Sequence, residues 1–452
     1  MARSIYAAVQ QIKAEVAQFL SPQLIRNVCE TVGHLWRDRI LDPVTTVHLF
    51  VLQILHGNTA CPHVPRLGRI ACSGEAYCQA RQRLPLRVLQ YLLRALGLNL
   101  GGSPMLDDGR WHGHRTFLVD GSSVSMPDTP SLQKEFGQPG AQKPGCGFPV
   151  MHLLALFHAT TGFLLNVASA PLRTHDMSRV GKVHPDLAAG DLLVADRAFC
   201  SYVHVALLAA RGIFGLFRAH QKQIVDFRSR RRTASKRSRQ RRECGLPSSR
   251  WLKRLGRHDQ LVESLKPKRR PPWLTAEAFA ALPAAITVRE LRYTISERGC
   301  RARVITLTTT LLDAERYPAA DIAALYGQRW QIETNFRHLK QTLRMDVLRC
   351  KTVEGVRKEL AMYALVYNMV RLVMLAAAQR QGVPVARISF IDAVRWLADA
   401  AHGAAELQLR LIPHRPGRFE PRAVKRRPKE YNRLNKPRAV LRKRLLSERD
   451  AA

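Results

Sequence analysis

The sequence predicts a mixed α/β protein with a helical N-terminal region. Apolar residues recur at helical spacing over the first 110 residues, and after Thr116 short β-rich apolar runs alternate with helical segments. The 452 residues exceed what one ordinary hydrophobic core holds, so two or three domains are expected. Apolar residues make up 46% of the chain, which indicates a folded protein.

The charge of the chain indicates a polyanionic partner. Lys and Arg number 72 against 35 Asp and Glu, which gives a formal net charge of +37. Repulsion at this level destabilises a compact state, and nucleic acid is the commonest partner that relieves it. A ribosomal or chromatin-packing protein would share this charge, but such proteins are usually shorter and less apolar.

Cysteine usage and hydropathy favour a cytoplasmic protein without a membrane span. The nine cysteines are scattered and form no CxxC pair, so reduced thiols are expected rather than a zinc ribbon or a disulfide framework. Lys13 and Glu15 fall where a signal peptide needs an apolar run. The stretch 360–378 is apolar enough to span a membrane, but Asn368 and Arg371 lie in its middle. We therefore interpret it as a buried core helix.

Residues 1–112 are expected to form a helical domain that binds DNA. Helical periodicity occurs in two segments before residue 56, and a further helix pair follows in which Arg81, Arg83 and Arg87 lie close together. Basic helical faces suit docking on duplex DNA, although no helix-turn-helix spacing is distinct enough to assign. A helical packing domain without DNA contacts is the alternative.

Residues 113–217, continued by 320–380, are expected to form the central sheet domain. Three strands come first, and Thr161–Gly162 signals a tight hairpin between the second and third. A helix over 177–187, a strand ending at Asp196, another helix and another strand follow. This order predicts a ribonuclease-H-like mixed sheet, with the first three strands antiparallel and the later strands joined by crossovers.

Residues 218–319 are interpreted as a basic, partly β insertion in this sheet domain. Lys or Arg occupies 11 of the 26 positions in 218–243, and like-charge blocks of this length usually contact nucleic acid, although a solvated loop is the alternative. Trp251 and Trp273 flank basic residues and either stack on bases or simply pack. Residues 381–452 form a basic C-terminal region that is expected to be extended alone and to fold against DNA or a second subunit.

Two aspartates end predicted hydrophobic strands. Asp120 follows the apolar run 117–119, and Asp196 follows the run 192–195. A carboxylate abutting a buried strand is costly unless it is paired or bound to a metal. Two of them in a basic protein favour metal binding over a role in turns. Phosphodiester cleavage commonly uses two divalent ions, and hard ions such as Mg²⁺ prefer converging carboxylate oxygens.

Other polar residues near these strands have simpler interpretations. Asp128 and Asp176 compete with Asp120 as metal ligands, but Asp128 lies in a Pro-flanked turn. Asp176 precedes a predicted helix, where N-terminal capping is the simpler role. His152 and His158 lie in an apolar strand pair and are expected to be packed or hydrogen-bonded core residues.

A third carboxylate, Glu333, lies on a helix predicted over residues 326–340. Tyr326 and Lys340 are seven residues away on either side and share its face, and Arg329 lies one turn before it. An Arg–Glu pair at this spacing is often an ordinary surface pair. This stripe, however, gathers a carboxylate, two cations and a phenol, which favours a metal ligand flanked by phosphate-binding groups.

The spacing Tyr326-x2-Arg329-x3-Glu333-x6-Lys340 resembles the YREK signature of the insertion-sequence-four family of DDE transposases. The segments GDLLVADRAF and FLVDGSSVSMPDTP resemble that family's motifs around its second and first aspartates. The likeness extends upstream to AYCQARQRLP and downstream to KRRPKEY, so it covers most of the chain.

The resemblance implies a DNA transposase located at the nucleoid. It implies three catalytic acids that bind two Mg²⁺ or Mn²⁺ ions, namely Asp120, Asp196 and Glu333. It implies three residues that grip the DNA backbone near the scissile phosphate, namely Tyr326, Arg329 and Lys340. The implied reaction cleaves double-stranded DNA at the terminal inverted repeats of an insertion sequence and joins the 3′-hydroxyl to target DNA, within a homodimeric synaptic complex. A nuclease that only cleaves and a non-catalytic DNA-binding descendant are the alternatives.

Overall fold

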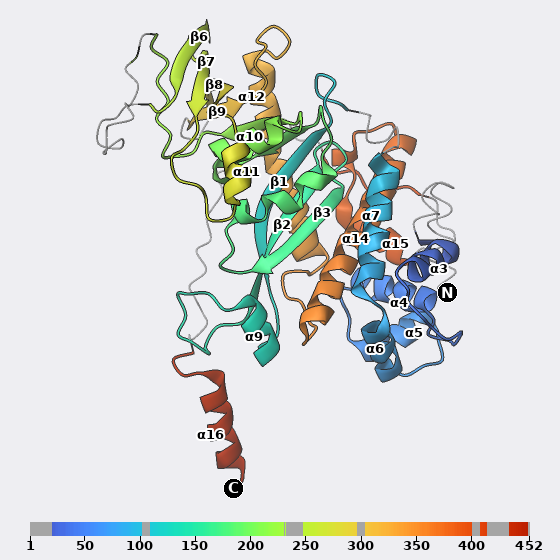
Figure 1. Ribbon diagram of the computed structural model, residues 1–452. Coiled ribbons are helices and arrows are strands. Elements are labelled where there is room, and N and C mark those ends of the chain that lie inside the picture. The colour runs from blue at the N-terminus through green and yellow to red at the C-terminus, as the bar shows by residue number, and fades with distance from the viewer. Residues whose placement is uncertain are drawn as a thin grey trace.

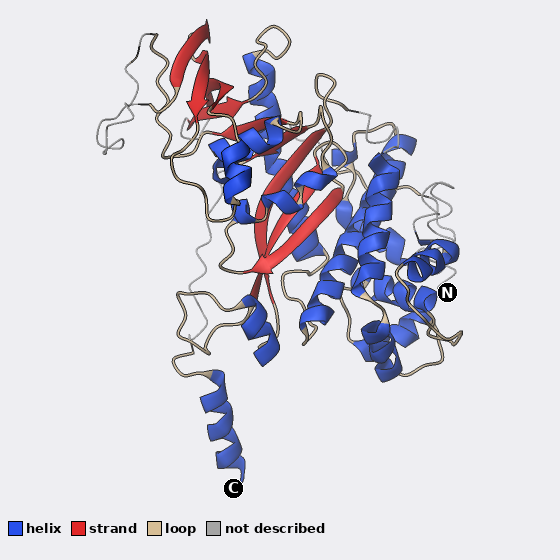
Figure 2. Cartoon of the chain, in the orientation of Figure 1, coloured by secondary structure: helices blue, strands red, loops and turns tan. Residues whose placement is uncertain are grey.

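The computed structural model describes residues 20–101, 109–229, 231, 247–295, 303–399, 407–413 and 434–450. Within these ranges a nine-stranded mixed sheet is covered by helices, which confirms the predicted mixed α/β class (Figure 2). One face of the sheet packs on a large core that contains helix α14 (Val353–Arg380). The other face packs on a smaller core that contains α10 (Tyr202–Ala209).

The sheet is continuous, in the order β3-β2-β1-β4-β5-β9-β8-β7-β6. β1, β4 and β5 are parallel, and the other neighbouring pairs are antiparallel. The strands of the basic segment 218–319 therefore extend the same sheet, because β9 pairs with β5. In chain order the strands are β1 (Thr116–Ser125), β2 (Val150–His158), β3 (Leu164–Pro171), β4 (Leu192–Ala195), β5 (Phe214–Arg218), β6 (Arg250–Gly256), β7 (Asp259–Leu265), β8 (Ala285–Ile295) and β9 (Arg303–Thr309).

Side-chain caps begin many of the helices. Ser21, Asp42 and Thr352, for example, accept hydrogen bonds from backbone N–H groups in the first turns of α3, α4 and α14, as helix N-termini require. Besides α10 and α14, the helices are α3 (Pro22–Thr31), α4 (Pro43–Leu55), α5 (Val64–Gly68), α6 (Gly74–Arg83), α7 (Leu86–Gly101), α9 (Pro130–Phe136), α11 (Ala276–Ala281), α12 (Ala319–Gly327), α13 (Gln331–Arg337), α15 (Phe390–Asp399) and α16 (Arg438–Asp450).

The N-terminal helices share one hydrophobic core with the sheet, since α4 and α7 pack on α14 (Figure 1). Arg81 does not join the exposed Arg83 and Arg87 in a basic face. Its guanidinium lies 3.8 Å from the centre of the Phe50 ring and donates a hydrogen bond to Gln53. The prediction that Arg81 clusters with Arg83 and Arg87 is therefore wrong. Arg81 instead joins α6 to α4.

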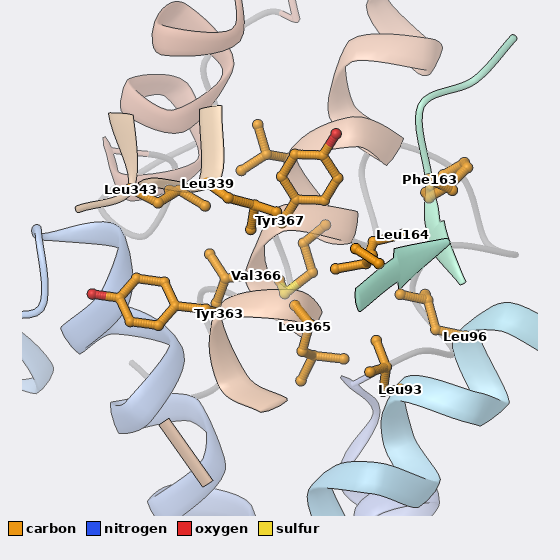
Figure 3. Packing of buried hydrophobic residues seen from close by; sticks show 14 of the residues in the cluster. Leu93, Leu96, Phe163, Leu164, Leu339, Leu343, Tyr363, Leu365, Val366 and Tyr367 are labelled. Atoms are coloured by element: carbon orange, nitrogen blue, oxygen red, sulfur yellow. The ribbon is translucent and has the colours of Figure 1, made fainter. Parts of the chain in front are cut away.

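Helix α14 contains the apolar stretch that was predicted to be a buried core helix, and this prediction is confirmed. By length and composition it could cross a membrane, but 94% of its most apolar window is buried inside the protein. Leu365 of α14 lies near Leu93 and Leu96 of α7 and Leu164 of β3 (Figure 3). This packing joins the helical region to the sheet.

The polar residues of α14 bind the hairpin between β2 and β3. Asn368 accepts a hydrogen bond from the Leu164 N–H and donates one to the Leu164 carbonyl, both at 2.8 Å. Arg371 donates to the carbonyl of Thr161 at 2.8 Å, and Gly162 supplies the positive φ of +72° that the predicted tight turn needs. Buried polar groups are tolerated when they are hydrogen-bonded. The residues that argued against a membrane span thus fix the hairpin.

The prediction of an α-helix over residues 177–187 is wrong, because this segment forms 3₁₀ turns. Gly181 weakens a helix by its backbone freedom, and Pro185 lacks the N–H that a continuing helix would use. The chain instead makes three short 3₁₀ turns, at Asp176–Ser178, Val180–Lys182 and His184–Asp186.

Helix α16 projects away from the rest of the described chain (Figure 1). Its first residue holds it to the body, because Arg438 donates to the Asp128 carboxylate at 3.2 Å and lies 3.8 Å from the centre of the Phe148 ring. The C-terminal region, expected to be extended alone, therefore contains a helix over residues 438–450. Residues 414–433 of that region lie outside the described residues.

Replacing Asn368 by Leu is expected to lower the free energy of unfolding by about 2–6 kcal/mol, because two buried backbone groups of Leu164 lose their partners. Met369→Leu, a volume-conserving change at the next buried position, serves as the control and is expected to cost less than about 1.5 kcal/mol. Denaturant unfolding measures both. Equal losses in the two variants would contradict the hairpin-binding role of Asn368.

Candidate active site

Two aspartates follow residues that are paired across neighbouring parallel strands. Val119 of β1 is in register with Ala195 of β4, and Asp120 and Asp196 come directly after them. Because successive side chains of a strand point to opposite faces, both aspartates lie on the face of Leu118, which α14 and its neighbours cover. The two predicted carboxylates are therefore side by side, although β1 continues five residues past Asp120.

Local hydrogen bonds hold both carboxylates. Asp120 accepts from the Gly121 N–H at 2.8 Å, and Asp196 accepts from the Ala198 N–H at 2.7 Å and so caps the turn Arg197–Phe199. Burial raises the pKa of Asp120 to about 6, and the neighbouring Asp196 carboxylate contributes to the rise. A desolvated carboxylate beside a like charge is a group that a bound cation would stabilise.

The segment that carries the other predicted site residues is helical but irregular. The prediction of one regular helix over 326–340 is wrong in detail, since α12 passes through a 3₁₀ turn at Gln328–Trp330 into α13 and then into a π-helical turn at His338–Thr342. A π turn admits one extra residue and is frequent at functional sites. Lys340 lies in this turn, and its Nζ reaches the Ser122 hydroxyl of β1 at 3.4 Å.

Arg329 lies between the strand acids and Glu333. One guanidinium nitrogen is 3.6 Å from an Asp120 oxygen and the other is 3.7 Å from a Glu333 oxygen. The Arg329 side chain is 14% exposed, whereas that of Glu333 is 50% exposed. Arg329 thus supplies the positive charge that partly offsets the buried carboxylate.

Tyr326 packs beneath this group of charges. Its side chain is buried, and burial raises the pKa of its phenol to about 12. The Arg329 guanidinium lies 6.0 Å from the centre of its ring. The Asp196 carboxylate is near enough to contribute to the raised pKa of Tyr326. The structure therefore brings Asp120, Asp196, Tyr326, Arg329 and Glu333 together. The sixth predicted residue, Lys340, contacts Ser122 on the strand that carries Asp120.

The donor set suits a hard divalent cation, but the third carboxylate stands apart. Asp120 and Asp196 offer adjacent oxygen donors at the edge of rigid parallel strands, which Mg²⁺ and Mn²⁺ prefer. In the part of the chain that the structure describes, no three His, Cys, Asp or Glu side chains converge closely enough to hold a metal ion. Glu333 would complete the set when Arg329 no longer lies between it and Asp120.

The competing acids have structural roles. Asp128 accepts from Gln133 at 2.8 Å as well as from Arg438. Asp176 was interpreted as a helix cap, which is wrong, because the His175 side chain accepts the hydrogen bond of that turn. The Asp176 carboxylate instead lies 3.0 Å from Nε2 of His152 on β2.

The contact between His152 and Asp176 was missed by sequence reasoning, because it joins two segments that no motif links. Gly121 allows it, since a Cβ at that position would lie 2.6 Å from the Asp176 carboxylate. Asp176 is near enough to add to the raised pKa of Asp120. The glycine directly after the first aspartate was the signal available in the sequence.

Two buried histidines support the turn after Asp196. His204 Nδ1 donates to the Phe199 carbonyl at 2.9 Å, and its Nε2 lies 3.1 Å from Nε2 of His184. The rings stack with an interplanar angle of 4°. Burial lowers the pKa of His184 to about 3 and that of His204 to about 4, so both rings are neutral at pH 7.

Paired carboxylates on parallel strands, with arginine, tyrosine and lysine on a facing helix in a highly basic chain, define a class of metal-dependent enzymes that act on nucleic acid. Residues 111–369, more than half of the chain, match the family "Transposase DDE domain". The chain belongs to the insertion-sequence-four family of DDE transposases, enzymes that act on DNA and depend on divalent metal ions.

One curated protein and one solved structure illustrate the range of similarity. The chain is 26% identical over 378 residues to "Transposase InsG for insertion sequence element IS4" of Escherichia coli (strain K12), covering 79% of this chain and 77% of that protein. It also resembles a solved structure, the cryo-EM structure of a piggyBac transposase synaptic complex with hairpin DNA, at a TM-score of 0.40 and 11% identity, covering 85% of this chain and 78% of that one. The interpretation of the sequence as a DDE transposase is confirmed.

Replacing Asp120 by Asn is expected to stabilise the metal-free protein by about 1–3 kcal/mol at pH 8, because it removes a desolvated charge beside Asp196. Asp191→Asn is the matched control, and it is expected to lower the free energy of unfolding instead of raising it. Asp191 is also buried, but it makes two hydrogen bonds to Arg115, at 2.8 and 2.9 Å. Thermal unfolding in EDTA measures both changes, and a destabilised Asp120→Asn protein would contradict the raised pKa.

The histidine pair predicts loss of stability in acid. As the pH falls from about 6.5 towards 4, His184 and His204 bind protons in the unfolded chain but stay neutral in the folded protein. The free energy of unfolding therefore falls by up to about 1.4 kcal/mol per pH unit for each histidine. His184→Phe is expected to flatten the pH dependence of the unfolding free energy between about pH 6.5 and 5, because about 6.5 is the ordinary pKa at which a histidine of the unfolded chain begins to bind a proton. Comparison at pH 8 isolates the packing effect. Parallel profiles for variant and wild type would show that His184 is not buried as a neutral ring.

Proposed function

We propose that this transposase cleaves DNA at the ends of its insertion sequence and joins the freed 3′-hydroxyl groups to target DNA by cut-and-paste transposition. The observation that carries the proposal is the register of β1 and β4, which puts Asp120 and Asp196 side by side, with Glu333 linked to Asp120 through Arg329. We propose that these three acids hold two Mg²⁺ or Mn²⁺ ions. Such ions activate the attacking oxygen and stabilise the leaving oxygen.

The side chains around the acids would hold the DNA. In cleavage, water attacks the scissile phosphorus and the bond to the 3′-oxygen breaks; in joining, that 3′-hydroxyl attacks a target phosphate and displaces a target 3′-oxygen. Arg329 offsets the negative charge of the acids in the structure, so cation binding there would free its guanidinium for a phosphate. Tyr326 and Lys340 flank the same position, and we propose that they contact the DNA backbone beside the scissile phosphate.

The fold supports a division of the chain around this site. We propose that β3-β2-β1-β4-β5 and α14, within residues 113–217 and 320–380, form a ribonuclease-H-like catalytic core. Residues 218–319 would then be an insertion that extends its sheet. The helical residues 1–112 would bind DNA, and the basic residues 381–452 would contact DNA or a second subunit. The antiparallel order of the first three strands and the crossovers to β4 and β5 support this assignment.

The reaction also defines partners. Two element ends must be joined to one target, so we propose a homodimer that holds both terminal inverted repeats in a synaptic complex at the nucleoid. The net charge of +37 suits several DNA segments held together.

A strand-transfer assay tests the function. Pre-cleaved element ends and a target plasmid, with Mg²⁺, are expected to give joined products with the wild-type protein. Asp120→Asn, Asp196→Asn and Glu333→Gln are each expected to reduce joining by at least about a hundredfold while DNA binding in EDTA persists, because each loses a metal-binding charge. Asp128→Asn, at the competing acid, is the control and is expected to retain joining.

Two results would overturn the proposal. Cleavage of intact ends without joining of pre-cleaved ends would indicate a nuclease. Joining that survives loss of Asp120, Asp196 or Glu333 would place the chemistry elsewhere.

A further inference from the structure

A basic depression lies beside β6 and β7, the last strands of the sheet on the side of β5 and four to five strands away from Asp196. It is lined by the turn between β6 and β7 and by the segment 224–229, and its volume is about 640 Å³. We name it the arginine pocket after the four arginines in its lining, Arg228, Arg254, Arg257 and Arg292.

The arginine pocket has excess positive charge. Asp226 is the carboxylate in its lining, and it already binds Arg228, with oxygen–nitrogen distances of 2.9 and 3.1 Å. Among the described residues, neither Arg254 nor Arg257 forms an ion pair, and both side chains are exposed. Unpaired arginines converging on one depression are suited to bidentate binding of phosphate.

One side of the pocket is rigid. The Arg292 guanidinium donates to the Thr306 hydroxyl at 3.0 Å and to the Val225 carbonyl at 3.2 Å, and it lies 4.8 Å from the centre of the Phe227 ring. The Phe227 ring in turn packs against His258 of the β6–β7 turn, with 5.7 Å between ring centroids. These contacts hold the two walls of the pocket together without a ligand, which lowers the entropy cost of binding one.

The pocket lies at the same edge of the sheet as the acids. β4 and β5 end at this edge, and β9 runs back from it, so Arg218 of β5 pairs with Leu307 of β9. Leu307 pairs with Leu291, and Leu291 pairs with Asp259, which directly follows the β6–β7 turn. Four to five strand spacings of about 4.8 Å put the pocket about 19–24 Å along this edge from Asp196.

We infer that the arginine pocket binds backbone phosphates of the DNA strand that extends from the cleavage site along this edge of the sheet. This inference rests on the proposed function, since it takes the acids as the position of the scissile phosphate. At about 3.4 Å per nucleotide along a duplex, the distance corresponds to phosphates about five to seven nucleotides from the scissile one. Because the contacts are to phosphates, the binding is independent of base sequence.

The test measures DNA binding in an Asp120→Asn background in EDTA, so that no cleavage occurs. Arg254→Gln with Arg257→Gln is expected to weaken binding of a short element-end duplex about 10–100-fold at 0.1 M salt, and to lower the slope of log affinity against log salt by about 2. A duplex of scrambled sequence is expected to show the same loss of slope. The control, Lys134→Gln with Lys182→Gln, removes the same charge from exposed positions on α9 and at the end of the turn Val180–Lys182.

A single neutral methylphosphonate then locates the contact. Placed about five to seven nucleotides from the scissile position, it is expected to weaken binding by the parent protein and to leave binding by the pocket variant unchanged. An unchanged salt slope in the pocket variant, or an equal loss in the control, would overturn the inference. Failure of strand transfer with these binding results intact would instead count against the proposed function alone.

Discussion

The burial of the Asp120 carboxylate beside that of Asp196, at the edge of the sheet, is the constraint on which this structure depends. Parallel pairing of β1 with β4 puts Asp120 and Asp196 side by side, and burial raises the pKa of Asp120 to about 6. Arg329 offsets that charge from a facing helix. The pairing costs free energy in the metal-free protein, and the proposed metal site would explain it, since one cation would need both oxygens at one place.

A strained pair of charges needs a rigid support, and α14 provides it. Asn368 and Arg371 fix the β2–β3 hairpin, and β2 pairs with β1 from Phe117 to Ser125. On the same face, Phe157 of β2 packs edge-on against Phe336 of α13, with ring centroids 5.5 Å apart. The strand and the helix that carry the acids therefore pack on the same hydrophobic core. This packing fixes the distance between them more strictly than loops would.

The features that sequence predicted are those with a local signal. The strands before Asp120 and Asp196, the hairpin at Gly162 and the buried helix α14 follow from periodicity, apolar runs and turn residues that act within a few positions. Gly181 and Pro185 are a local signal for the 3₁₀ turns that replace a predicted helix. The π turn at Lys340 and the contact of Asp176 with His152 depend on packing between distant segments, and Gly121 is the local sign of that contact. The spacing of Tyr326, Arg329, Glu333 and Lys340 identified the family without requiring a regular helix.

The same edge of the sheet has to attract DNA and carry acids that repel it. Near the acids Arg329 is engaged with carboxylates, so it contributes little to a distant phosphate until those acids are neutralised. Affinity for the DNA must therefore come from cations that no carboxylate engages. Arg254 and Arg257 meet this condition, and the continuous sheet holds them at a fixed distance from Asp196. On the proposed function, the extension of the sheet through β9, β8, β7 and β6 would separate DNA binding from chemistry. The acids could then be arranged for metal ions alone, while the DNA strand would be held several nucleotides away.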